Sequence, residues 1–185
     1  MKDQIHFSSE ISFQSNIECD PIQKAWIIPA QVCYCAEAFS AVNFQHPDAP
    51  KLSLLSAALR NGYLHSAIRE KGGAYGSGAS NEPSTGVFRF FSYRDPNCKN
   101  TFDHFKKSIE WLDTNLSQQN LDEAVLNVIS SIDKPLSPSG EAKVDFYGTL
   151  NGKSHEDLVA FRDGVLNTNI SDIKRVAEKL SLIHI

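Results

Sequence analysis

One run of residues most constrains the fold of this chain. It leads from a helical pattern, through two glycines, into a strand of small side chains. Residues 67–78 read AIREKGGAYGSG. The pattern before Gly72 is helical, and glycine ends helices readily because it adopts the left-handed conformation without steric cost. Arg69 and Tyr75 therefore flank a helix-to-strand hinge, where a guanidinium and a phenol can reach one opening.

The helix before this hinge has a clear start and a clear stripe. Apolar residues recur every three or four positions from Leu52 to Ala67, which is the spacing of one helical face. Asp48 follows His-Pro and is a candidate helix cap. We therefore predict one helix from Asp48 to Lys71.

Three segments are predicted as strands. Residues 25–42 read as one long strand, in which Pro29 is tolerated only at an edge or a bulge. Residues 74–81 and 85–94 read as a hairpin with its turn at Glu-Pro-Ser. The second hairpin strand carries apolar side chains on both faces, which predicts that it is central in its sheet.

Helical patterns dominate the rest of the chain. Capping boxes are predicted at Asn120 and Ser154, and Ser171 is expected to open the last helix. Strands first and helices later favour an α+β fold, a largely antiparallel sheet with helices packed on one face. We assign residues 20–185 to a single α+β domain and residues 1–19 to a linker or first strand.

Composition excludes several classes of partner. A formal net charge of −4 argues against nucleic acid, because phosphate neutralisation needs a basic face. No apolar run approaches the roughly 20 residues of a membrane span, and the N-terminus lacks the apolar core of a signal peptide. The four cysteines include no CxxC pair, which favours reduced thiols of the cytoplasmic type. The cellular compartment stays unassigned.

The chain lacks the motifs that would make it a metal or nucleotide enzyme by itself. The six histidines form no HExxH or HxxEH pair, so no metal site is predicted. Phosphate-binding glycine loops precede a helix N-terminus, whereas these glycines follow a helix C-terminus of negative partial charge. Nucleotide binding is therefore disfavoured.

The glycine segment is better suited to an extended peptide. Alternating residues share one face of a strand, so a nearly bare face follows the hinge. A peptide can approach that face or add along the strand edge. The candidate substrate-binding residues are Gly72, Gly73, Ala74, Gly76 and Gly78. Arg69 and Tyr75 are suitable donors to a peptide oxyanion. On pattern alone, the alternative is a structural helix end, with Arg69 paired to a carboxylate and Tyr75 packed.

Three sequence runs resemble one known family. Residues 61–65 (NGYLH) and 68–76 (IREKGGAYG) resemble the C-terminal half of the insulinase/pitrilysin-like inverzincin zinc metallopeptidases, closest to the presequence-protease branch. Residues 90–96 (FFSYRDP) resemble the same branch. The resemblance covers residues 20–180, and its most specific part is the GGAYG segment.

The resemblance implies that the active site is divided between two halves of a larger enzyme. Such enzymes have two halves that enclose a chamber for unstructured peptides, and the HxxEH zinc site lies in the N-terminal half. The C-terminal half supplies an Arg and a Tyr, which by the motif are Arg69 and Tyr75. The implied partners are the zinc-bearing half and an extended peptide. Zinc is expected in the parent enzyme and not in this chain, which is predicted to be inactive alone. The domain is also expected to lack its last strand here.

Three hypotheses follow from the sequence. The first is a substrate-clamping C-terminal domain with Arg69 and Tyr75 as catalytic residues. The second is a non-catalytic scaffold or peptide-binding subunit of the same fold. The third is an unrelated α+β module with a coincidental glycine hinge. The presence of both Arg69 and Tyr75 favours the first over the second, because a scaffold does not need the pair.

Overall fold

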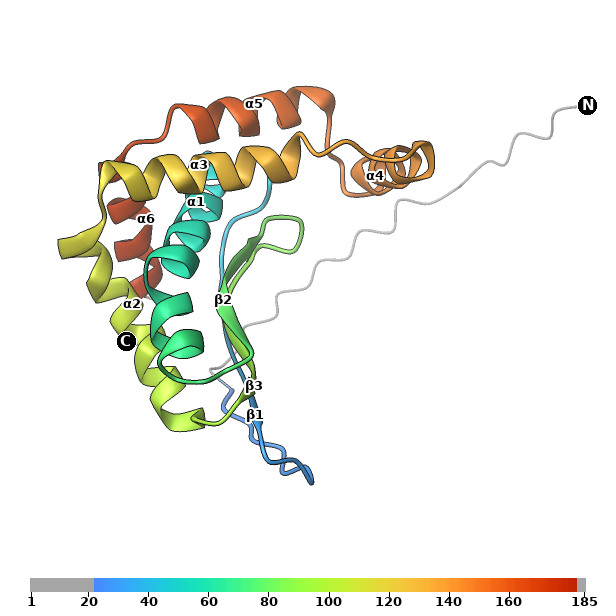
Figure 1. Ribbon diagram of the computed structural model, residues 1–185. Coiled ribbons are helices and arrows are strands. Elements are labelled where there is room, and N and C mark those ends of the chain that lie inside the picture. The colour runs from blue at the N-terminus through green and yellow to red at the C-terminus, as the bar shows by residue number, and fades with distance from the viewer. Residues whose placement is uncertain (1–21, 183–185) are drawn as a thin grey trace, which may run out of the picture.

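The fold is the α+β arrangement that the sequence predicts. The computed structural model describes residues 22–182 (Figure 1). Its three strands form one antiparallel sheet in the order β1-β3-β2, with bounds β1 (Cys33–Ser40), β2 (Gly76–Glu82) and β3 (Val87–Asp95). The predicted central strand, β3, is indeed the middle one. The linker or strand predicted for residues 1–19 lies outside the described residues.

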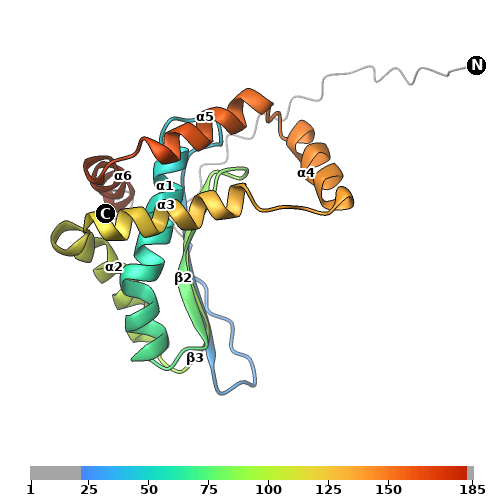
Figure 2. The same cartoon turned by 45° about the horizontal axis from the view of Figure 1, so that its top comes forward.

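Helices make up most of the described chain. Their bounds are α1 (Ala49–Leu59), η1 (Arg60–Glu70), α2 (Cys98–Asn115), α3 (Gln118–Ile132), α4 (Pro138–Leu150), α5 (His155–Leu166) and α6 (Ile170–Leu182). The π-helical segment η1 continues α1 directly, so the predicted long helix is present. The helices that contact the sheet lie on one side of it, and α4 projects away from the body (Figures 1 and 2).

The core lies between the sheet and the helices around α1. Leu54, Leu55 and Leu59 are fully buried, because β2, α3, α5 and α6 all pack against α1. A helix that is apolar all round is typical of such a central position. Phe90 of β3 completes the core by stacking on Phe105 of α2, with ring centroids 5.3 Å apart.

The first strand is shorter than predicted. Residues 25–32 do not pair with the sheet, and β1 begins only at Cys33. Pro29 has no N–H to offer a neighbouring strand. Trp26 and Ile27 are 81% and 101% exposed, so this apolar run is not part of the described core.

Two of the three predicted helix starts differ from the structure. The capping box predicted at Ser154 is present, with Asp157 as its partner. The box predicted at Asn120 instead starts at Ser117 and uses Asn120 as its third helical residue. The last helix begins before Ser171, because Asn169 accepts from the backbone N–H of Asp172 at 3.0 Å.

Helix α4 was not predicted as a helix. Its residues include no buried side chain, so it lacks the apolar stripe that reveals other helices. Local signals start it nonetheless: Pro138 lies in its first turn, and Ser137 accepts from the backbone N–H of Gly140 at 3.2 Å.

Asp48 links the start of α1 to α6 and is not a side-chain cap. It occupies the N-cap position of α1 but makes no capping hydrogen bond with its side chain. Its carboxylate accepts from Arg175 at 2.7 and 3.2 Å and from Lys179 at 2.9 Å. The Arg175 guanidinium, with Lys179, holds the pKa of Asp48 well below its usual range. This ion pair fastens α6 to the start of α1.

The helix-to-strand hinge depends on two glycines with different roles. Gly73 has φ +78°, the left-handed conformation. Gly72 has no room for a side chain, because a Cβ there would lie 2.5 Å from the Ile68 carbonyl oxygen. Hydrogen bonds then close the helix end, from Gly73 N to Arg69 O at 3.0 Å and from Ala74 N to Ile68 O at 3.1 Å.

None of the helices in residues 22–182 combines the length and hydrophobicity that a bilayer span requires.

We expect Asp48→Asn to lower the free energy of unfolding by about 2 kcal/mol at neutral pH, because it removes the negative charge that accepts three ionic hydrogen bonds from Arg175 and Lys179. A carboxyl whose folded pKa is depressed adds stability above its unfolded pKa of about 4 and loses it as the pH falls through the folded pKa. The difference between the two proteins should therefore shrink in acid. Urea unfolding between pH 7 and pH 2 measures it.

The matched control is Asp133→Asn. Asp133 pairs with Arg162 at 3.1 Å, but both side chains are more than 40% exposed. Its loss should cost less than about 1 kcal/mol. An Asp48 variant no less stable than this control would contradict the role given to Asp48.

We expect Gly72→Ala to destabilise the chain by roughly 1–3 kcal/mol, because the new Cβ would overlap a backbone oxygen that cannot move freely. Gly148→Ala is the control. It lies inside α4 with its nearest neighbour, Lys153 Cβ, at 3.9 Å, so alanine should stabilise by about 0.5–1 kcal/mol through helix propensity. Thermal unfolding followed by circular dichroism separates the two effects, and equal melting temperatures would argue against the tight hinge.

Candidate functional site

Arg69 and Tyr75 line one open hollow at the end of the sheet. The hollow measures about 560 Å³ and is lined by Val32, Arg69, Glu70, Gly73, Ala74, Tyr75 and Arg94. Arg69 comes from the last turn of η1, and Tyr75 directly precedes β2. The two glycines between them turn the chain so that both side chains face the same opening.

Arg69 is oriented by a histidine. Its Nη1 lies 3.2 Å from His65 Nε2, one helical turn earlier. The other imidazole nitrogen, Nδ1, lies 3.4 Å from Glu70 Oε1. Because Arg69 can only donate, Nε2 must accept, which assigns the proton to Nδ1 and directs it toward Glu70. The sequence patterns gave His65 no role in the site, although the NGYLH run contains it.

Tyr75 is not a packed core residue. Its side chain is 61% exposed, and its ring lies 5.6 Å from that of Tyr93 at a tilt of 57°. Its backbone N–H donates to the carbonyl of Arg94 at 3.3 Å. The phenol is therefore available to a ligand in the hollow, in contrast to the structural alternative in which Tyr75 is packed.

Arg94 is a lining residue that the sequence reasoning did not select. Its guanidinium carbon lies 5.7 Å from the centre of the Tyr75 ring, within the range of a cation–π contact. The sequence places Arg94 in the FFSYRDP run, but no local pattern there indicates that its side chain turns toward Tyr75.

The candidate substrate-binding residues separate into three groups. Gly73 and Ala74 line the hollow. Gly72 instead borders a second hollow on the other side of the hinge. Gly76 and Gly78 are buried rather than bare, because neighbouring side chains occupy the space beside them. At Gly76 and Gly78, β2 contributes no side chain to its own face, but side chains from neighbouring elements cover that face.

Neighbouring side chains fill the space that these two glycines leave. A Cβ at Gly76 would lie 2.3 Å from the ring of Tyr93, and one at Gly78 would lie 2.9 Å from Arg60 and 3.3 Å from Phe91. Tyr93 and Phe91 stand opposite the two glycines on β3. Gly76 and Gly78 therefore allow close packing of rings against the strand.

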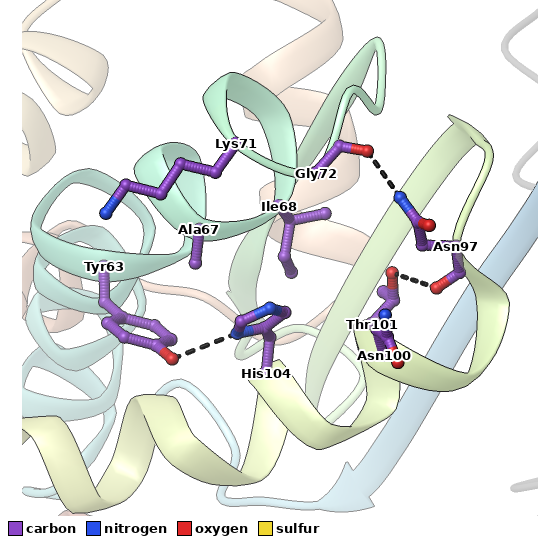
Figure 3. A pocket seen from close by; sticks show the side chains of 9 residues that line it. All are labelled: Tyr63, Ala67, Ile68, Lys71, Gly72, Asn97, Asn100, Thr101 and His104. Carbon is purple, nitrogen blue, oxygen red and sulfur yellow. Dashed lines mark hydrogen bonds between the residues drawn. The ribbon is translucent and has the colours of Figure 1, made fainter.

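Residues around the second hollow support the end of η1 through hydrogen bonds. This hollow measures about 350 Å³ and is lined by Tyr63, Ala67, Ile68, Lys71, Gly72, Asn97, Asn100, Thr101 and His104 (Figure 3). Tyr63 Oη lies 3.0 Å from His104 Nδ1, and Asn97 Nδ2 donates to Gly72 O at 2.5 Å. Burial, with a contribution from Glu110, raises the pKa of Tyr63, so its hydroxyl stays protonated. These contacts tie η1 to α2.

The described cysteines are free thiols. Cys33, Cys35 and Cys98 form no disulfide. Burial raises the pKa of Cys35 to about 12, so it is a neutral thiol at physiological pH. Among residues 22–182, no group of three or more histidine, cysteine, aspartate or glutamate side chains is arranged to bind a metal ion.

The sequence matches one family model over most of its length. Residues 23–184 match the PreP C-terminal domain. The mitochondrial presequence protease of Emericella nidulans is 42% identical over 160 residues, which is 85% of this chain and 15% of that protein. The Drosophila melanogaster presequence protease is 38% identical over 162 residues, with coverage of 86% and 15%. The chain thus spans about 15% of the length of the curated relatives it matches.

Solved structures share the fold at lower identity. A protease from Helicobacter pylori aligns with a TM-score of 0.71 and 22% identity, over 83% of this chain and 39% of that one. The peptidase M16 inactive domain from Pseudomonas fluorescens aligns with a TM-score of 0.63 and 21% identity, over 83% and 38%. At these identities the likeness concerns the fold. The family match and the curated relatives confirm the resemblance to presequence proteases, and the chain belongs to the family of presequence-protease C-terminal domains.

Proposed function

We propose that this chain is the substrate-binding domain of a zinc metalloendopeptidase that degrades unstructured peptides, with Arg69 and Tyr75 acting on the substrate. One observation carries the proposal: both side chains, from opposite sides of the Gly72–Gly73 hinge, line one open hollow. The relatives are several times longer than this chain, which supports a site completed by other domains of the same parent protein.

The two residues supply hydrogen-bond donors in this proposal. The guanidinium of Arg69 and the phenol of Tyr75 donate to a peptide carbonyl oxygen and stabilise the negative charge that develops on it during hydrolysis. Gly73 and Ala74 lie between them in the sequence and line the same hollow. Neither carries a bulky side chain, so an extended backbone can come close. Zinc belongs to the N-terminal half of the parent, as the resemblance implies, and the described residues of this chain do not fit it.

The exposure of Tyr75 favours this function over a scaffold of the same fold. A phenol that served packing would lie among core side chains, whereas Tyr75 is 61% exposed. Arg69 likewise donates to His65 instead of lying in a buried ion pair. Both donors therefore have room for a ligand.

We expect Tyr75→Phe in the full-length peptidase to lower kcat on the order of 100-fold, which is typical of the loss of one oxyanion donor. The melting temperature should be unchanged, because the hydroxyl is exposed. Arg69→Ala should also lower kcat/KM. Steady-state kinetics on an unstructured peptide provide the measurement.

The control for this experiment is Tyr147→Phe, the same chemical change at an exposed tyrosine of α4. It should leave kcat unaltered. Unchanged turnover in both the Tyr75 and Arg69 variants would reject the catalytic role and favour the scaffold function.

The isolated 185-residue chain should bind no stoichiometric zinc and should not cleave peptides, because it lacks an HxxEH motif. Elemental analysis of the purified chain after incubation with zinc and dialysis tests the first point. One tightly held zinc ion per chain would overturn this expectation.

A further inference from the structure

Arg94 is the extra residue of a β-bulge beside the hollow. On β1, Tyr34 pairs with Tyr93 and the adjacent Cys33 pairs with Asp95, so Arg94 has no partner between them. Its φ is +49°, and among residues 22–182 it is the one non-glycine residue with positive φ. Bulges of this kind redirect a side chain and are frequent next to active sites.

The bulge changes which residue faces the core. Strict alternation after Tyr93 would direct Arg94 toward the helices, on the same side as buried Ser92. Instead Asp95 takes the inward position and is fully buried. Its carboxylate accepts from Asn97 N at 2.8 Å and from Thr101 Oγ1 at 2.6 Å. Arg94 is left exposed at the mouth of the hollow.

The backbone of the bulge does not explain an arginine at this position. Glycine adopts positive φ freely and asparagine adopts it readily, whereas other side chains meet steric strain. Strained residues of this kind cluster at functional sites. The reason for the arginine must therefore lie in what its guanidinium contacts.

The contact that Arg94 makes is with Tyr75. Its carbonyl accepts the Tyr75 N–H at 3.3 Å, and its guanidinium carbon lies 5.7 Å from the Tyr75 ring centre. Tyr93 lies against the same ring at 5.6 Å. An exposed ring that the core does not hold is thus held by Arg94 and Tyr93.

We infer that Arg94 is a positioning residue that holds the phenol of Tyr75 toward the hollow. This inference rests on the proposed function, because a position of Tyr75 has a catalytic consequence only if Tyr75 acts on the substrate. It adds to the pair Arg69 and Tyr75 a third residue of the chain, which acts through Tyr75.

A double-mutant cycle in the full-length peptidase tests the inference. Arg94→Gly removes the guanidinium and suits the φ of the bulge, so the fold should be retained. We expect it to lower kcat about fivefold, the order of one exposed cation–π contact, with a smaller change in KM. Arg94→Lys, which keeps a cation, should recover part of the loss. In a Tyr75→Phe background, Arg94→Gly should cause no further loss of kcat.

Each other outcome has a defined meaning. Equal loss of kcat in both backgrounds would overturn the inference, because Arg94 would then act independently of Tyr75. Full kcat in Arg94→Gly together with low kcat in Tyr75→Phe would also overturn it while leaving the proposed function intact. Full kcat in both Tyr75→Phe and Arg69→Ala would reject the proposed function itself.

Two controls exclude a general loss of structure. Arg162→Ala removes an exposed arginine on α5 and should leave kcat unaltered. The melting temperature of the Arg94→Gly chain should equal or exceed that of the parent chain. If it falls, Arg94→Asn, which also tolerates positive φ, takes its place in the cycle, and the same kcat criteria apply.

Discussion

The short reversal of the chain at Gly72 and Gly73 determines how the rest of the structure can be arranged. A helix must end and a strand must begin within a few residues, while the Ile68 carbonyl lies too close to admit any side chain at Gly72. The amide of Asn97 binds the carbonyl of Gly72, and Asp95 in turn binds Asn97. The end of η1, the end of β3 and the start of α2 are therefore one hydrogen-bonded unit, and the walls of the hollow belong to it.

Buried side chains are concentrated on the side of the sheet that the helices cover, and the opposite side of the sheet is exposed. Helix α1 is enclosed between the sheet and the outer helices, and Asp48 fastens it to α6. The opposite face of the sheet carries the exposed side chains of Tyr34 and Tyr93, and α4 exposes Phe146 and Tyr147. Exposed apolar surfaces of this kind mark protein or ligand contacts.

Local sequence patterns predicted the elements that bury a face or end at a glycine. The apolar stripe from Leu52 onward, the hairpin and the central strand are of this kind, because periodicity reflects burial directly. Helix α4 was not predicted, because none of its side chains is buried. The bulge at Arg94 arises from pairing with Cys33 and Tyr34, about sixty positions earlier in the sequence, and so no local pattern contains it. Of the site, the sequence predicted the Arg and the Tyr but not the residues that orient them.

Those orienting residues decide what the pair can do. A guanidinium paired with a carboxylate gives up much of its electrostatic effect on a ligand, since the opposite charge lies beside it. Arg69 instead donates to the neutral nitrogen of His65, and Glu70 contacts the imidazole on its far side. Tyr75 is held through its ring and its backbone, so its hydroxyl is not used in holding it. Both donors are thus oriented by contacts that leave N–H groups of Arg69 and the O–H group of Tyr75 available to a ligand. A developing oxyanion requires donors that are arranged in this way.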